Sequence, residues 1–131
     1  MSARAVEGTG IAPASLSISL ADPYDFLDVA LGGIAEVTFT VTNNGDAMSS
    51  SMGSTLNPPY SFKDGSYPGT GGDCSSTLDG ISGTNTCTLV VTFSPTVLGS
   101  GITETLNLNY NDGAFAPVSY THLTLPTTPY V

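Results

Sequence analysis

The chain has 131 residues, of which 40% are hydrophobic and only 10% are charged. This length is typical of one domain, and the hydrophobic share is enough to build a core. The 11 acidic side chains outnumber 2 basic ones and give a formal net charge of −9. Nucleic acid and anionic membrane surfaces repel such a chain, so we expect no nucleic-acid partner. No apolar run reaches the length of a membrane span, so we also expect no direct membrane insertion.

Strand patterns recur along the first half of the chain, whereas helix patterns do not. Two weak runs come first, in ASLSISL around Leu16 to Leu20 and in YDFLDVA around Tyr24 to Val29. The strongest pattern covers residues 35–42, where apolar residues alternate with Glu and Thr. This period of two predicts a strand with one face on a core and the other in water. The turn formers of Asn43-Asn44-Gly45 follow it.

Two further strands and a long loop are predicted in the second half. The segment from Asn57 to Gly83 is long and rich in glycine, so we expect a large loop with one short strand around Tyr60 to Phe62. Alternation then predicts strands over residues 87–94 and 106–110, with Val90 as the one apolar residue on the outer face of the first. Short strands separated by turn residues are typical of an all-β sandwich.

Three motifs occur in order along the chain: Asp25-Phe26, then Asn43-Asn44-Gly45, then Thr92-Phe93-Ser94-Pro95 with Gly99. In this order they resemble the bacterial choice-of-anchor D repeat, which is related to the immunoglobulin-like domains of the abnormal-spindle and hydin class. The resemblance extends from about Ala14 to Ala114. It implies an all-β, immunoglobulin-like sandwich of two sheets and about seven strands. Leu27 stands where the family usually has glycine, so the detail of the first turn is open.

Both ends of the chain are expected to lie outside this domain. Residues 1–13 resemble the closing strand of a preceding repeat followed by a short linker, which implies a tandem array. Residues 118–131, VSYTHLTLPTTPYV, resemble the translation of a sequencing-library adapter. We therefore expect the domain of residues 14–117 to lack its native final strand. Either residues 118–125 or residues 4–10 should then occupy the open sheet edge, without biological meaning.

The resemblance also implies a role for the only two cysteines. Cys74 and Cys87 fall where the family commonly has a disulfide pair. Such a bridge would attach the glycine-rich loop to the sandwich. It would also favour an oxidising compartment, which for a bacterial protein means the extracellular space, the cell surface or the periplasm. Two reduced thiols are the alternative.

We predict that the chain is not an enzyme and has no cofactor or metal site. His122 is the only histidine and lies in residues 118–131, so a serine or cysteine nucleophile has no credible base. Two cysteines and this histidine cannot complete a zinc site. Three acidic residues lie close together and could in principle perform glycosidase chemistry, but solvated carboxylates explain them better: Asp22, Asp25 and Asp28.

Two groups of oxygen-bearing side chains could in principle bind calcium. They are Asn43, Asn44 and Asp46 in one segment, and Asn109, Asn111, Asp112 and Gly113 in the other. Neither has the spacing of an EF-hand, and Asn-Gly and Asp-Gly are above all turn formers. The glycine-rich run of residues 69–72 precedes no helix and has no lysine, which excludes a phosphate-binding loop.

Three functions remain. We favour a non-catalytic structural or spacer module of a tandem-repeat protein that is secreted or anchored at a bacterial surface, with neighbouring repeats as partners. The first alternative is an adhesive or carbohydrate-binding module that contacts a protein or glycan through Tyr60, Phe62 and Tyr67. The second is an intracellular scaffold domain like the ciliary relatives. Exposed aromatic rings would favour adhesion, whereas burial of Tyr60 and Phe62 would favour the spacer.

Overall fold

The computed structural model describes residues 2–20, 23–99, 102–114 and 119–125. These residues form strands and one short 3-10 helix. The elements are β1 (Leu16–Ile18), β2 (Ala35–Asn43), β3 (Ser50–Gly53), β4 (Tyr60–Phe62), η1 (Lys63–Gly65), β5 (Thr86–Phe93), β6 (Thr105–Asn111) and β7 (Ser119–Thr124). No helix in the described part is long and apolar enough to cross a membrane.

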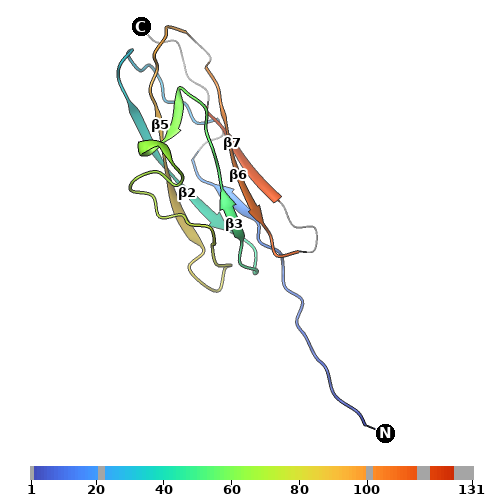
Figure 1. Ribbon diagram of the computed structural model, residues 1–131. Helices are drawn as coiled ribbons and strands as arrows, with labels where there is room; N and C mark the ends of the chain where they lie inside the picture. Colours follow the sequence, from blue (N-terminus) through green and yellow to red (C-terminus); the bar gives the residue numbers. More distant parts are fainter. Residues whose placement is uncertain (1, 21–22, 100–101, 115–118, 126–131) are drawn as a thin grey trace.

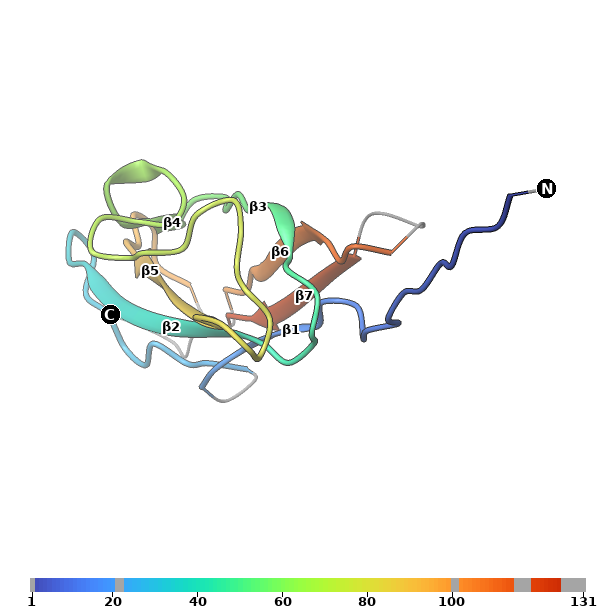
Figure 2. The ribbon, with the colours of Figure 1, turned by 90° about the horizontal axis from the view of Figure 1, so that it is seen from below.

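The strands form two antiparallel sheets that pack face to face (Figures 1 and 2). One sheet has the order β1-β2-β5-β4 and the other has the order β3-β6-β7. If the strands are lettered A to G in chain order, the first sheet has the order A-B-E-D and the second has the order C-F-G. This is the arrangement of constant-type immunoglobulin domains. The prediction of an all-β, immunoglobulin-like two-sheet sandwich is therefore confirmed.

The core lies between the two sheets and follows the predicted alternation. In the β2–β5 ladder, Phe39 is paired with Leu89, and both side chains are fully buried. The opposite sheet contributes Leu106 and Leu108 of β6, which are also fully buried. Burial of each such side chain contributes about 1.5–3 kcal/mol to the stability of the domain.

The weak strand predicted around Tyr24 to Val29 is wrong. No strand is present over residues 23–34. Asp25 instead accepts a hydrogen bond from the amide of Leu27 at 2.8 Å, and Leu27 has a φ of 62°. A short side chain that binds the backbone two residues ahead competes with strand pairing. Phe26 still reaches the core, where its ring lies 5.8 Å from that of Phe93.

The positive φ of Leu27 leads to a stability prediction. A left-handed conformation costs a residue with a Cβ about 1–2 kcal/mol, and Leu27 is 65% exposed, so it loses little contact on truncation. Leu27→Gly should therefore raise the free energy of unfolding by about 0.5–1 kcal/mol, after the entropy of glycine is subtracted. Urea unfolding measures this change. Leu31→Gly, at a position without positive φ, is the control and should be destabilising; a loss of stability in Leu27→Gly would refute the assignment.

Strand β3 was not predicted, and the edge beside β6 is filled as expected. The sequence of β3 has no alternation of apolar and polar residues. At the other side of β6, strand β7 pairs from Thr105 with Thr124 to Tyr110 with Ser119. Residues 2–11 form no strand and extend away from the sandwich (Figures 1 and 2). Of residues 118–131, the positions 118 and 126–131 lie outside the described residues.

Candidate functional site

A disulfide joins the long loop to the central strand of the first sheet. It links Cys74 with Cys87 of β5, and the two Cα atoms are 4.8 Å apart. Both cysteines are buried. The bridge holds the middle of the glycine-rich loop against β5, which carries much of the core.

The same loop continues the edge of the first sheet beyond the short strand β4. The amide of Val90 donates to the carbonyl of Pro68 at 2.9 Å, and the amide of Cys74 donates to the carbonyl of Thr88 at 3.1 Å. The Asp73 carboxylate accepts from the amide of Thr88 at 2.7 Å. The loop thus supplies β5 with the partners that a longer β4 would have given.

Val90 has the predicted outward phase of β5, but it is not exposed to solvent. Val90 is buried, because residues 68–72 cross over this part of β5. Gly69 has a φ of 85°, and a Cβ there would collide with the carbonyl of Val90. Glycine at this position therefore allows the loop to lie directly on the sheet.

The loop also covers the outer edge of the second sheet. Ser49 and Leu78 exchange two backbone hydrogen bonds of 2.9 and 3.2 Å, and the amide of Met52 donates to the carbonyl of Ser76 at 3.0 Å. Backbone groups of an edge strand that would otherwise face solvent are therefore paired. One loop closes this side of the sandwich along both sheets.

Tyr60 and Phe62 of the loop region belong to the core, and Tyr67 packs against it half-buried. Tyr60 and Phe62 are only 1% and 3% exposed, and the Tyr60 hydroxyl donates to the carbonyl of Ile102 at 2.8 Å. The ring of Tyr67 packs edge-on against Phe62, and its hydroxyl donates to the carbonyl of Ser75 at 2.9 Å. Burial raises the pKa of Tyr67 to about 12, so the phenol stays protonated at physiological pH. These rings do not form an exposed platform for a ligand.

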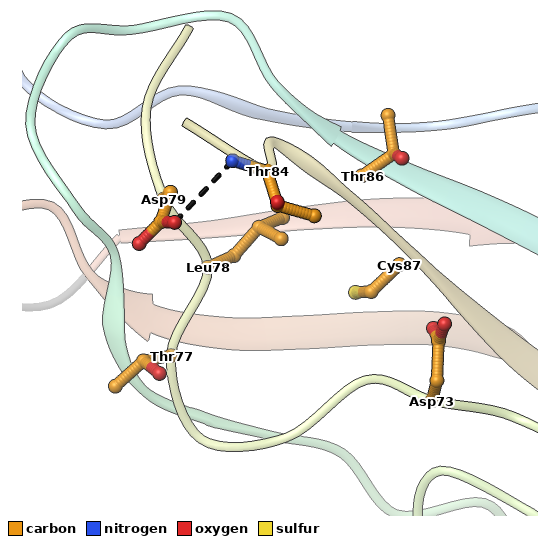
Figure 3. A pocket seen from close by; sticks show the side chains of 7 residues that line it. All are labelled: Asp73, Thr77, Leu78, Asp79, Thr84, Thr86 and Cys87. Atoms are coloured by element: carbon orange, nitrogen blue, oxygen red, sulfur yellow. Dashed lines mark hydrogen bonds between the residues drawn. The ribbon is translucent and has the colours of Figure 1, made fainter. Parts of the chain in front are cut away.

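A hollow of about 240 Å³ lies beside the disulfide, and its acidic side chains bind the backbone (Figure 3). Asp79 accepts a hydrogen bond from the amide of Thr84 at 3.3 Å, and Asp73 is bound to Thr88. In the described ranges, no three side chains of Cys, His, Asp or Glu are grouped as metal ligands. Asp79 therefore holds a turn, and Asp73 attaches the long loop to β5.

The candidate calcium ligands are likewise distributed over turns. Asn111 and Asp112 accept hydrogen bonds from the amides of Gly113 and Ala114, each at 2.9 Å. Asp46 accepts from the amide of Ala12 at 3.1 Å. Of the proposed acidic group near β1, Asp25 binds within its own turn, and Asp22 lies outside the described residues.

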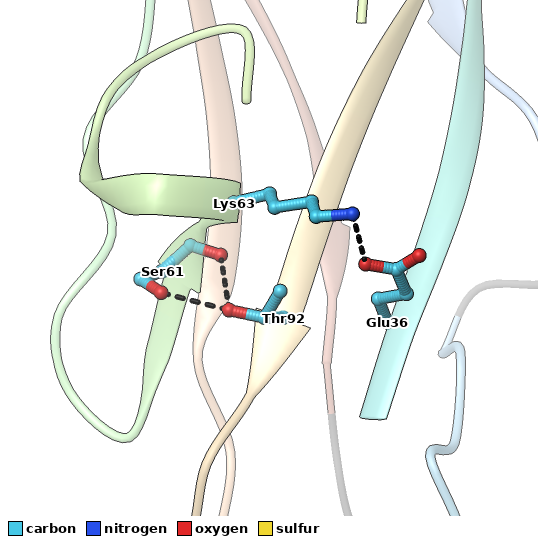
Figure 4. A network of polar contacts seen from close by, with 4 residues as sticks. All are labelled: Glu36, Ser61, Lys63 and Thr92. Atoms are coloured by element: carbon cyan, nitrogen blue, oxygen red, sulfur yellow. Dashed lines mark hydrogen bonds and ion pairs between the residues drawn. The ribbon is translucent and has the colours of Figure 1, made fainter. Parts of the chain in front are cut away.

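Two polar contacts on the outer face of the first sheet involve β2, β4 and β5 (Figure 4). Lys63, the first residue of η1, forms an ion pair of 3.1 Å with Glu36 of β2. Beside it the hydroxyls of Ser61 and Thr92 are 2.8 Å apart. Both members of the ion pair are exposed, so the pair contributes at most about 1 kcal/mol. This arrangement supports the sheet and has no geometry of a reaction centre.

Asn43 is the structurally important polar residue whose role the sequence analysis missed. Its side chain is fully buried at the end of β2. The Oδ1 atom accepts from the amides of Ser15 and Gly45 at 3.1 and 2.9 Å. The Nδ2 group donates to the carbonyls of Ala47 and Leu78 at 2.9 and 3.3 Å. One side chain therefore joins the N-terminal segment, the turn after β2 and the long loop.

The N-terminal segment is held firmly from Ala12 onward. The carbonyl of Ala12 accepts from the amides of Asp46 and Ala47 at 3.1 and 3.0 Å. The amide of Ala14 donates to the carbonyl of Asp112 at 2.9 Å. Gly45 has no room for a Cβ beside the carbonyl of Pro13. The segment therefore has a defined position where it joins the sandwich.

Comparisons with known proteins support the fold. No protein-family model and no curated protein matches the chain. Among solved structures, it is similar to the ASH or PapD-like domain of human CEP192, with a TM-score of 0.62, 15% identity, and coverage of 98% of this chain and 96% of that one. It is also similar to the VesB protease of Vibrio cholerae, with a TM-score of 0.63 and 16% identity over 86% of this chain. The chain spans 31% of the length of that protease. The likeness to the PapD-like domain supports the fold, an all-β sandwich of the immunoglobulin-like kind.

Removal of the disulfide has a defined expected effect. Cys87→Ser should lower the free energy of unfolding by about 3 kcal/mol in oxidising buffer, because the open chain regains loop entropy. In reductant the parent loses the same bridge, so the two proteins should differ little. Urea unfolding under both conditions provides the comparison. Equal stability of parent and variant in oxidising buffer would show that the bridge does not constrain the domain.

Proposed function

We propose that this chain is a non-catalytic structural module that spaces or displays neighbouring domains of a secreted or surface-anchored bacterial protein. The observation that carries this proposal is the packing of the long loop. The loop is attached by a disulfide, is paired with both sheets, and surrounds buried Tyr60 and Phe62. In a sandwich with binding loops, by contrast, aromatic and polar groups remain available at the surface.

The disulfide supports an extracellular or periplasmic location over an intracellular scaffold. Stable bridges between Cys74 and Cys87 require an oxidising compartment. Titration of free thiols in the native protein, purified without reductant, tests this point. Two reactive thiols would favour the intracellular alternative, and none would favour the extracellular one.

The fixed N-terminal segment supports a role in a tandem array. Because residues 12–15 are bound to the turn after β2, a domain joined before them would have a restricted orientation. In this proposal residues 1–13 carry the end of a preceding repeat and its linker, as in the choice-of-anchor D class. Residues 14–117 form the domain, and residues 118–131 are adapter-encoded, so the pairing of β7 has no biological role.

An adhesive module is the second candidate, and an apolar end of the sandwich favours it. Two neighbouring loops there, joined by a bond from the amide of Gly32 to the carbonyl of Pro95, present Leu31, Ile34 and Leu98 to solvent. Exposed aliphatic side chains in one region are typical of interaction surfaces. Adhesion would then use this end rather than the long loop.

A binding panel separates the two candidates. The oxidised chain, displayed in many copies on beads, is exposed to glycans and extracellular-matrix proteins, with Leu98→Asp and Thr70→Lys as variants. The spacer proposal expects no retention above that of blank beads. Retention that is lost in Leu98→Asp would favour adhesion through the apolar end. Retention that is lost in Thr70→Lys would assign binding to the long loop and contradict the proposal.

A further inference from the structure

Asn44-Gly45 is the only Asn-Gly pair in the chain, and this dipeptide is chemically reactive. The backbone nitrogen of glycine can attack the side-chain carbonyl carbon of asparagine, because glycine has no Cβ to hinder the approach. A C–N bond forms, the C–N bond of the side-chain amide breaks, and ammonia leaves with the proton of the backbone nitrogen. Water then opens the cyclic imide at either carbonyl and leaves aspartate or isoaspartate.

The folded domain binds both reacting groups through hydrogen bonds. The attacking nitrogen, that of Gly45, is buried and donates to Asn43 Oδ1 at 2.9 Å. The amide of Asn44 points to other acceptors: its Nδ2 group donates to Ser17 Oγ at 3.1 Å and to the Ser15 carbonyl at 3.4 Å. These bonds restrain the Gly45 nitrogen and the Asn44 side chain, and each bond that is lost on the way to the attack raises its barrier.

We infer that Asn44-Gly45 is a latent deamidation site, which the side chains of Asn43 and Ser17 keep closed while the domain is folded. Asn44 itself is exposed, so water for the second step is available and only the geometry prevents the first. Opening of this turn exposes the site to spontaneous modification.

Modification would damage the attachment of the N-terminal segment. Aspartate at position 44 lacks the Nδ2 donor for Ser15 and Ser17. Isoaspartate adds a methylene group to the backbone beside Gly45, where there is no room for a Cβ next to the carbonyl of Pro13. Closure of the site therefore preserves the fixed position of residues 12–15, which matters for a long-lived spacer.

The test compares folded and unfolded protein. The oxidised chain is incubated in mildly alkaline buffer with and without urea, and the peptide containing Asn44 is analysed by mass spectrometry and by an isoaspartate assay. We expect deamidation in the folded protein to be slower by roughly fivefold or more, the factor that one net hydrogen bond of about 1 kcal/mol supplies. Equal rates in the two states would overturn the inference.

Two variants at exposed positions, Ser17 in β1 and Ser15 just before it, test the role of the individual hydrogen bonds. Ser17→Ala removes one acceptor of the Asn44 amide and should accelerate deamidation of the folded protein severalfold. Ser15→Ala is the matched control, because Ser15 acts through its backbone, and its rate should equal that of the parent. A parental rate in Ser17→Ala would overturn the part assigned to Ser17.

Discussion

Replacement of Asn43 by alanine should lower the free energy of unfolding by about 4 kcal/mol. The variant removes four hydrogen bonds to backbone groups, two of them buried and two part-buried. Each buried group that loses its hydrogen bond costs on the order of 1 kcal/mol or more, and the vacated space adds the loss of packing around the side chain. Urea unfolding of the oxidised protein measures the loss.

Asn44→Ala provides the control for this prediction. Asn44 is the adjacent asparagine, but it is exposed, and its side chain makes only two surface hydrogen bonds. Its replacement should cost less than about 1 kcal/mol. If the two variants were equally stable, the central role of Asn43 in this end of the domain would be refuted.

Replacement of Phe93 by alanine should cost about 4 kcal/mol. Phe93 is fully buried at the end of β5, with its ring centroid 5.0 Å from that of Tyr60 and 5.8 Å from that of Phe26. Truncation removes the transfer free energy of the ring and leaves a cavity among aromatic neighbours that cannot easily collapse. Phe39, fully buried on the paired strand, should behave similarly.

Two comparisons make this second prediction specific. Phe93→Leu keeps most of the volume and should lose less than about 1.5 kcal/mol. Leu98→Ala, at a position that is 66% exposed in the following loop, should change stability by less than about 0.5 kcal/mol. A Phe93→Ala variant as stable as Leu98→Ala in urea would contradict the assignment of the core.

The regular strands could be predicted from the sequence because their side chains alternate. Strands β2, β5 and β6 each place apolar residues on one face, and the predicted ranges agree closely with the observed ones. The short strand β4 was also correctly predicted from Tyr60 to Phe62. These features depend on local periodicity, which a sequence displays directly.

The features that were missed depend on contacts between distant segments. Val90 has the outward phase of β5, yet the loop of residues 68–72 covers it. Strand β3 has no alternation, and it is defined by its partners on β6 and by Leu78. Around Tyr24 to Val29, the Asp25 side chain prevented the predicted strand.

Asn43 shows which signal a sequence can offer for a buried polar group. It occupies the inward phase of β2, after Phe39 and Val41, where another apolar residue would continue the pattern. A polar residue at an inward position requires hydrogen-bond partners. The sequence could not identify these partners, because they come from segments up to 35 residues away.

Native-state hydrogen exchange of the oxidised chain tests most directly whether the long loop is part of the scaffold. We predict that the amides of Cys74, Leu78 and Val90 exchange nearly as slowly as those of the β2–β5 ladder. The reason is that the Cys74 amide donates to β5, the Leu78 amide donates to Ser49 just before β3, and the Val90 amide donates to the long loop. Addition of reductant should accelerate exchange at Cys74 first. Rapid exchange of all three amides in oxidising buffer, while the amides of the ladder stay protected, would show that the loop is mobile. That result would contradict the proposal that the chain is a structural module.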